Sequence, residues 1–176
     1  CKFCNFNPSQ EDVRSVGGIR SVTTSLEETV EAYKILSSEV RLVEGNFVGG
    51  AFTNLEREGN IYFNLIEKLA SAASYKPDMC VVAQPVRNRK DYQRLKDAGP
   101  ERFNIDIEVW DPQLFVEICP GKAKNIGYER FKEAHLEAVD VFGVGNVVGN
   151  LVSGATLMPS NGHGSWQESR DSVIEG

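Results

Sequence analysis

Residues 79–109, MCVVAQPVRNRKDYQRLKDAGPERFNIDIEV, decide the fold class because they contain an extended run, a helical run and a second extended run. Residues 79–83 are apolar throughout, as in a strand that is buried on both faces. Residues 91–98 form a short helical pattern that stops at Gly99. Residues 102–109 alternate, which places four apolar side chains on one face: Phe103, Ile105, Ile107 and Val109. A strand, a helix and a strand in this order predict a right-handed βαβ unit with parallel strands.

The same alternation continues on both sides of this unit. Ser25 and Glu28 form a capping box at the start of one helical pattern, and Gly143 ends another. In all, the sequence predicts helices over 26–37, 60–73, 91–98, 128–142 and 167–175, and strands over 39–48, 79–83, 102–109 and 146–157. Four strands with three complete crossovers predict an α/β fold, a partial (βα) barrel with parallel strands that lacks the first and last staves.

The length of 176 residues fits one domain with a sizeable core. We expect a single, incomplete domain over 1–176, with a cysteine-bearing loop at 1–10, the βα units of the barrel over 25–157 and the start of a C-terminal helix over 165–176. Because the chain begins without Met and ends in a helical pattern that no strand follows, we expect it to be a fragment.

Charge and hydropathy exclude two classes of partner. A total of 19 Lys and Arg against 25 Asp and Glu, net −6, leaves no basic footprint for nucleic acid. No run of about 18 apolar residues is present, so no membrane partner is expected. Cys80 lies in an apolar run, where a free thiol behaves as a small hydrophobe, and Cys119 lies beside a turn. These thiols indicate a reducing, cytoplasmic compartment rather than a disulfide framework.

Cys1 and Cys4 are spaced so that one tight turn brings both thiolates to a common soft metal. A pair alone leaves four alternatives open: zinc, an iron–sulfur cluster, a redox dithiol and two unconnected cysteines. Zinc needs four ligands, and the other candidates are scattered singly: Cys80, Cys119, His135 and His163. We expect His135 on a helix surface and His163 in a loop. The loop-like residues 5–9 differ from the helix that follows a thioredoxin-like dithiol.

Glycine and polar residues gather where the predicted strands end, at the edge where parallel α/β sheets bind ligands. Gly49 and Gly50 let the backbone approach a ligand closely, although a tight turn needs the same residues. Thr53 adds a hydroxyl beyond them. Asp106 and Glu108 fall on the same side of their strand, opposite its apolar face. Unless they lie at a solvated edge, carboxylates directed into a barrel need partners such as ligand hydroxyls, cations or hydrogen-bond donors.

Four segments resemble, in order and spacing, motifs of the radical S-adenosylmethionine (SAM) family. They are the cysteine pair with its aromatic residue at 1–4, the second-strand glycine motif at 49–50, the fourth-strand polar motif at 106–108 and the fifth-strand segment at 146–156. Residues 108–112 and 119–122 look most like the biotin synthase-related branch. The resemblance covers nearly the whole chain.

This resemblance implies a 4Fe–4S cluster held by Cys1, Cys4 and a third cysteine upstream. The cluster would cleave SAM reductively to a 5′-deoxyadenosyl radical, which abstracts hydrogen from an unknown small-molecule or peptide substrate. An electron donor such as flavodoxin or ferredoxin is implied. Glu108 would bind the SAM ribose, and no catalytic residue is assigned. The implied cofactor-binding residues are Phe3, Gly49, Gly50, Thr53, Asp106, Glu108, Val152 and Gly154.

Several positions depart from the family pattern. Ala51 and Thr156 stand where an acid is often found, and only Lys122 or Lys124 is available for the cofactor carboxylate. The chain as given could therefore be inactive. Two other functions stay open, namely a cofactor-free or degenerate barrel fragment that acts as a binding module, and another nucleotide-binding α/β enzyme.

Overall fold

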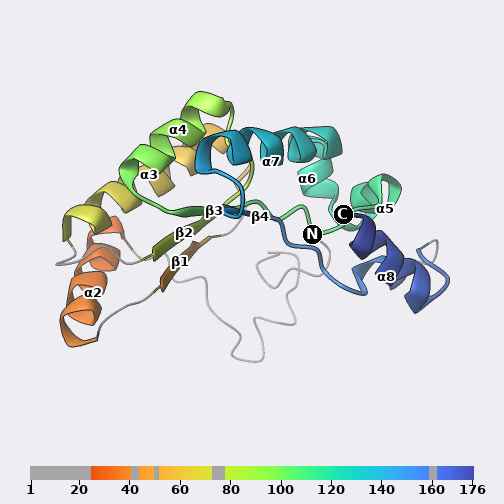
Figure 1. Ribbon diagram of the computed structural model, residues 1–176, viewed down its shortest axis with the longest axis horizontal. Helices are drawn as coiled ribbons and strands as arrows, with labels where there is room; N and C mark the ends of the chain where they lie inside the picture. The colour runs from red at the N-terminus through yellow and green to blue at the C-terminus, as the bar shows by residue number, and fades with distance from the viewer. Residues whose placement is uncertain (1–24, 41–43, 50–51, 73–77, 159–161) are drawn as a thin grey trace. The chain divides into compact units, whose positions relative to one another are not determined.

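Four parallel strands form one sheet in the order β1-β2-β3-β4, which confirms the predicted α/β fold. The computed structural model describes residues 25–40, 44–49, 52–72, 78–158 and 162–176 (Figure 1). The strands are β1 (Glu44–Val48), β2 (Asp78–Val82), β3 (Arg102–Asn104) and β4 (Val147–Val148). The helices are α2 (Leu26–Glu39), α3 (Leu55–Ala72), α4 (Arg89–Ala98), α5 (Pro112–Ile118), α6 (Pro120–Asn125), α7 (Tyr128–Phe142), the 3₁₀ helix η1 (Ala155–Leu157) and α8 (Trp166–Glu175).

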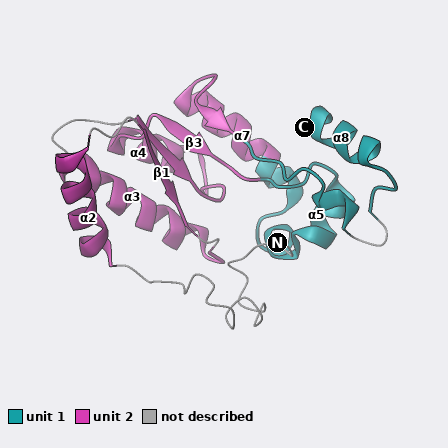
Figure 2. Cartoon of the chain, turned by 90° about the horizontal axis from the view of Figure 1, so that it is seen from below, with its two compact units in different colours: residues 1–23, 107–131, 149–176 teal, residues 24–106, 132–148 magenta. Residues whose placement is uncertain are grey.

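The chain divides into two compact units, which Figure 2 shows in different colours. The sheet unit comprises residues 24–106 and 132–148, and it contains all four strands. Among the described residues, the helical unit comprises 107–131, 149–158 and 162–176. The expectation of one domain stays a prediction.

An aromatic and aliphatic row on one face of the sheet forms the core of the sheet unit. Strand register aligns Phe47 with Val81, Val81 with Phe103, and Phe103 with Val147. Rings from three helices cover this row, with centroid distances of 6.4 Å for Tyr33–Phe47, 5.3 Å for Tyr92–Phe103 and 5.6 Å for Phe103–Phe142. The other apolar residues of the predicted row, Ile105, Ile107 and Val109, are also buried.

Local capping signals account for the helix ends that the sequence predicted correctly. The capping box of Ser25 and Glu28 is present at the start of α2. Gly99 and Gly143 follow α4 and α7 with φ angles of 129° and 93°, a backbone region that glycine enters without steric cost. The predicted C-terminal helix is α8, capped by Ser165.

The strand boundaries were predicted less well, and three corrections follow. Strand β1 begins at Glu44 and not at residue 39, because α2 continues through Glu39. Strand β3 ends at Asn104, so Asp106 and Glu108 do not share a regular strand. The segment predicted as a strand over 146–157 contains only the two residues of β4 before it turns into η1, whose first residue follows Gly154 at φ 80°.

Three helical features were missed or misplaced. Helix α3 begins at Leu55, five residues before the predicted start, because Asn54 Oδ1 accepts a hydrogen bond from Arg57 N (2.9 Å). Helices α5 and α6 were not predicted, although each starts with a proline in its first turn. Asp111 caps α5 through Gln113 N and Leu114 N. Within the part of the chain that the structure describes, no helix is long and apolar enough to cross a membrane.

Candidate functional site

Four of the predicted site residues, Cys1, Phe3, Cys4 and Gly50, lie outside the described residues. The predicted cluster ligands therefore stay a prediction. Among the described residues, no group of three or more His, Cys, Asp or Glu could hold a metal ion. The remaining predicted residues fall into both units.

The sheet unit contains a buried carboxylate at the ends of its first two strands. Glu58, in the first turn of α3, is only 3% exposed. Its Oε2 accepts hydrogen bonds from Phe52 N (3.2 Å) and from Gln84 Nε2 (2.6 Å), and its Oε1 accepts one from Gln84 N (3.0 Å). Gln84 Nε2 also donates to the carbonyl of Phe52 (2.7 Å). This network connects the segment after β1 to the segment after β2.

A second buried side chain of α3 reaches the glycine segment directly. The hydroxyl of Tyr62, which is 5% exposed, lies beside the backbone of Gly49. Burial raises the pKa of Tyr62 above its usual value, the charge of Glu58 raises it further, and the backbone of Gly49 opposes both effects. A Cβ added at Gly49 would lie 2.8 Å from the Tyr62 hydroxyl oxygen. The close approach of this tyrosine therefore explains why residue 49 is glycine.

Sequence reasoning missed Glu58, Tyr62 and Gln84. One signal was present: Glu58 lies four residues before Tyr62 on the stripe of α3 that also buries Ile66. A carboxylate on an apolar stripe indicates a specific buried partner, since an unpaired charge is costly to bury. The predicted helix began at residue 60, so Glu58 was not recognised as part of this stripe.

The other predicted residues of the sheet unit occupy less constrained positions. Asp106 is half-buried, and its charge acts on the Tyr62 hydroxyl together with that of Glu58. Thr53 is exposed. His135 was predicted to lie on a helix surface. It lies in helix α7, but its side chain is half-buried and its Nε2 lies 2.9 Å from the carbonyl oxygen of Ile105.

Glu108 is the central residue of the helical unit. Its φ of 74° is the one positive value found for a described residue other than glycine. Its backbone N–H donates to Asn150 O (2.9 Å), and its carbonyl accepts from Val152 N (2.8 Å). This pairing holds the predicted residue Val152 against the predicted residue Glu108. A left-handed residue that is not glycine costs free energy, and such residues cluster at functional sites.

The Glu108 carboxylate faces a buried lysine. Glu108 Oε1 lies 2.8 Å from Lys122 Nζ, and the two side chains are 16% and 10% exposed. The ammonium group of Lys122 also lies 5.4 Å from the ring centroid of Phe131. Lys122 was considered as a partner of the cofactor carboxylate, but in this structure it pairs with Glu108. Lys124 is exposed.

Four further residues of the helical unit were singled out in the sequence. Gly154 adopts φ 80° at the start of η1, and Thr156 Oγ1 lies 2.8 Å from Ser169 Oγ in α8. Cys119 is fully buried at the junction of α5 and α6, and burial raises the pKa of its thiol to about 11. His163 lies in a loop, as predicted, with Nε2 3.8 Å from Asp111 Oδ2.

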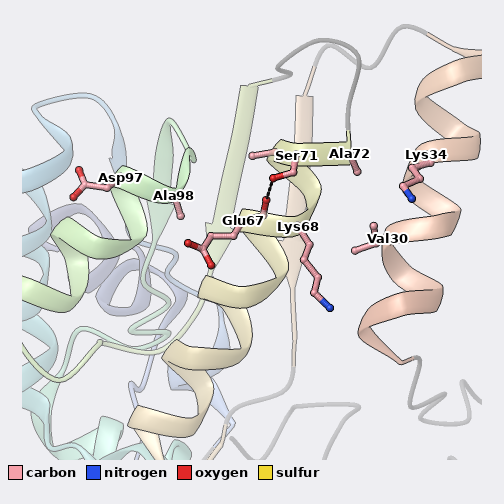
Figure 3. Close-up of a pocket in the computed structure, with 9 residues that line it drawn as sticks. Val30, Lys34, Glu67, Lys68, Ser71, Ala72, Asp97 and Ala98 are labelled. Carbon is pink, nitrogen blue, oxygen red and sulfur yellow. Dashed lines mark hydrogen bonds between the residues drawn. The ribbon is translucent and has the colours of Figure 1, made fainter.

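A hollow of about 600 Å³ in the sheet unit lies away from these residues (Figure 3). It is lined by α2 and by the C-terminal ends of α3 and α4, including Val30, Lys68 and Asp97. These helix ends precede β2 and β3 in the chain, so the hollow lies toward the N-terminal strand ends. Parallel α/β sheets bind ligands at the opposite edge, so we do not assign the hollow to the functional site.

Residues 1–168 match the family model described as the Radical SAM superfamily. This match covers nearly the whole chain and agrees with the parallel α/β sheet. The chain therefore belongs to the Radical SAM superfamily.

Two curated relatives match parts of the chain. A "Probable GTP 3′,8-cyclase" from Methanococcus aeolicus is 32% identical over 79 residues, which is 44% of this chain and 26% of the relative. The "Bacteriochlorophyllide c C-7(1)-hydroxylase" of Chlorobaculum limnaeum is 34% identical over 61 residues, which is 35% of this chain and 15% of the relative. The chain thus matches about a quarter or less of each relative's length. The family match and the two relatives, both named as enzymes, support an enzyme.

Proposed function

We propose that this chain is the core of an enzyme that binds a 4Fe–4S cluster and SAM and abstracts hydrogen from its substrate. The observation that carries the proposal is the family match over residues 1–168, a span that includes Cys1 and Cys4. When bound, the cluster and SAM supply a 5′-deoxyadenosyl radical, and the protein supplies binding, orientation and exclusion of water.

Two features of the described residues fit SAM. Gly49 is exposed, so a ligand can approach its main chain from the side that the Tyr62 hydroxyl does not occupy. Glu108 presents a carboxylate that can accept hydrogen bonds from two vicinal ribose hydroxyls. For the cluster, the thiolates of Cys1 and Cys4 have the chemistry that iron requires.

The ion pair with Lys122 gives Glu108 a specific role in this proposal. The lysine holds the carboxylate in one place, at an Nζ–Oε1 distance of 2.8 Å. An ionised acceptor forms stronger hydrogen bonds to hydroxyls than a neutral one does. The backbone bonds of Glu108 to Asn150 and Val152 fix the position from which the side chain extends.

The proposal includes three finer assignments, namely the branch of the family, the electron donor and the location. Membership of the biotin synthase-related branch is supported only by residues 108–112 and 119–122. An electron donor such as flavodoxin or ferredoxin follows from the proposed reductive chemistry. A cytoplasmic location is supported by the free, buried thiols of Cys80 and Cys119. The substrate, a small molecule or a peptide, is left open.

Anaerobic reconstitution of the protein that carries this chain tests the proposal. Incubation with iron and sulfide should load about four irons, with the broad visible absorption of a four-iron cluster. Cys4→Ala should abolish loading, whereas the matched control Cys80→Ala should retain it, because Cys80 is a buried strand residue. Stoichiometric zinc that survives reconstitution would contradict the proposal. Protein that takes up neither metal would favour a cofactor-free binding module.

A further inference from the structure

The surface at the start of helix α4 is basic, although the chain as a whole is acidic. Residues 87–97 contain five of the 19 Lys and Arg residues but two of the 25 Asp and Glu residues, and the whole chain carries a net charge of −6. Four of these basic side chains are exposed in or just before the first two turns of α4, and we call them the α4 basic surface: Arg87, Arg89, Lys90 and Arg94. Such a concentration of positive charge attracts negatively charged partners.

Two residues of the α4 basic surface occupy positions where a positive charge is unfavourable. Arg89 and Lys90 are the first two residues of α4. The N-terminal end of a helix carries partial positive charge, so it repels basic side chains in the first turn. The first turns of α2 and α8 follow the usual preference, with Glu27, Glu28 and Glu168. The stability of α4 therefore does not explain its two leading basic residues, and a break with a local rule of this kind indicates a functional role.

Arg94 is held in one orientation by α3, which lies beside α4 (Figure 1). Its guanidinium carbon lies 3.5 Å from the ring centroid of Phe63, and its Nη1 donates a hydrogen bond to Asn60 Oδ1 (3.1 Å). Among the residues that the structure describes, Arg89, Lys90 and Arg94 have no carboxylate at ion-pair distance. Their three charges are therefore available to a partner.

A hollow of about 100 Å³ between α3 and α4 adds a pocket to this surface. It is lined by Arg87 and Arg94, and also by the two acids that pair with Arg87, Glu56 at 3.6 Å and Asp91 at 3.8 Å. These pairs are exposed and longer than hydrogen bonds, so they contribute little and can be exchanged for a new partner. The hollow is larger than the roughly 10–15 Å³ that one water molecule needs, so it can receive a carboxylate side chain from another protein.

The α4 basic surface lies at the edge of the sheet that the proposed function uses. Helix α4 follows the C-terminal end of β2, and Gln84 in the connecting segment donates hydrogen bonds to Glu58 and to the carbonyl of Phe52. The segment after β2 is thus tied to the segment after β1. Because parallel α/β sheets bind ligands at this edge, a protein that docks on the α4 basic surface approaches the strand ends where SAM is proposed to bind.

We propose that the α4 basic surface is the docking site of an acidic electron-donor protein, whose carboxylates meet Arg89, Lys90 and Arg94. This inference rests on the proposed function, in which the 4Fe–4S cluster is reduced before SAM is cleaved. One electron passes from the donor, which is oxidised, to the cluster, which is reduced, and no proton moves. A net charge of −6 disfavours an extended polyanion such as nucleic acid, whereas an acidic patch of limited area matches this surface.

A double charge reversal tests the surface without weakening the helix. Arg89→Glu with Lys90→Glu places acidic side chains in the first turn of α4, where the helix dipole favours them, so the melting temperature should not fall. The matched control is Lys34→Glu with Lys68→Glu, which changes the net charge by the same amount. These two lysines are exposed and line the hollow toward the N-terminal strand ends.

The measurement is the rate at which reduced ferredoxin and reduced flavodoxin, both of net negative charge, reduce the cluster of the reconstituted protein that carries this chain. At low ionic strength we expect Arg89→Glu with Lys90→Glu to slow this reduction roughly tenfold, and we expect added salt to diminish the difference because it screens charges. Affinity for the oxidised donor, measured by calorimetry, should fall as well. Iron content and reduction by photoreduced deazariboflavin, a small uncharged reductant, should stay unchanged.

The outcomes separate this inference from the proposed function. If the unaltered protein loads no cluster, the proposed function fails and the inference fails with it. If the cluster loads and both double variants accept electrons from the donor proteins at the unaltered rate, only the inference fails. An equal loss in the control would overturn it too, because the effect would then come from net charge. Failure of both donors to bind the unaltered protein, with RNA or inorganic phosphate bound to the surface instead, would also overturn it.

Discussion

The two units hold their central carboxylates in different ways. Glu58 of the sheet unit is bound by three N–H donors from two loop segments, and it sits on a regular helix. Glu108 of the helical unit faces the ammonium group of Lys122, and its own backbone is strained at φ 74°. A carboxylate enclosed by backbone donors has little capacity left for a ligand. A carboxylate that pairs with a flexible lysine side chain and has more exposure can exchange or share that partner, so the first arrangement suits support and the second suits binding.

The largest expected effect comes from removing the enclosed carboxylate. Glu58→Leu leaves the N–H groups of Phe52 and Gln84 without their acceptor in a buried site, so it should lower the free energy of unfolding by about 3 kcal/mol. Urea denaturation of the protein, compared with Glu67→Leu on the exposed side of α3, measures this difference. A loss below about 1 kcal/mol would mean that water or another group readily replaces the carboxylate.

Breaking the ion pair of the helical unit should cost less, because both side chains retain some contact with solvent. Lys122→Met keeps the length of the side chain and should destabilise the protein by about 2 kcal/mol, below the 3–5 kcal/mol range for fully buried pairs. The double variant Lys122→Met with Glu108→Gln should recover part of that loss. If the double variant is as unstable as the sum of the two single variants, then the two side chains are not coupled.

A methyl group added at Gly49 should destabilise the protein less than either of these changes, and the substitution Tyr62→Phe should relieve the effect. Gly49→Ala places a Cβ 2.8 Å from the Tyr62 hydroxyl oxygen, and the expected cost is about 1.5 kcal/mol. Tyr62→Phe removes the oxygen, so the double variant should be closer to the single Tyr62→Phe protein than to Gly49→Ala. Thermal unfolding of the unaltered protein, the two single variants and the double variant measures this effect. If the two losses of stability simply add in the double variant, the contact with the Tyr62 hydroxyl is not the source of the loss.

The smallest expected effect concerns SAM binding by Glu108 in the helical unit. Glu108→Gln keeps the shape of the side chain and loses the charge, so it should weaken SAM binding about tenfold, or about 1.4 kcal/mol. Iron content should stay unchanged. Titration of the cluster-loaded protein with SAM measures the affinity, and Glu129→Gln in an exposed turn of α7 is the control. Unchanged affinity would assign Glu108 to the fold rather than to the site.

The contrast between the units also explains where sequence reasoning succeeded. In the sheet unit, the apolar run at 79–83 and the alternation from Phe103 predicted buried strands, and both are buried. In the helical unit, the strand predicted over 146–157 is mostly irregular, and α5 and α6 were not predicted. Short helices and two-residue strands leave no periodicity to recognise, and their ends depend on caps such as Asp111.

The sequence by itself determined the order of the four strands and the five longer helices, the parallel sheet and the family, because hydrophobic periodicity and ordered motifs are properties of neighbouring residues. It also singled out Gly49 and Glu108 as residues of interest. Only the tertiary structure decided their partners. Tyr62 and Lys122 lie 13 and 14 positions further along the chain, and they reach Gly49 and Glu108 because helices fold back over strand ends. Which donor meets which acceptor across such a distance depends on packing, which no local pattern records.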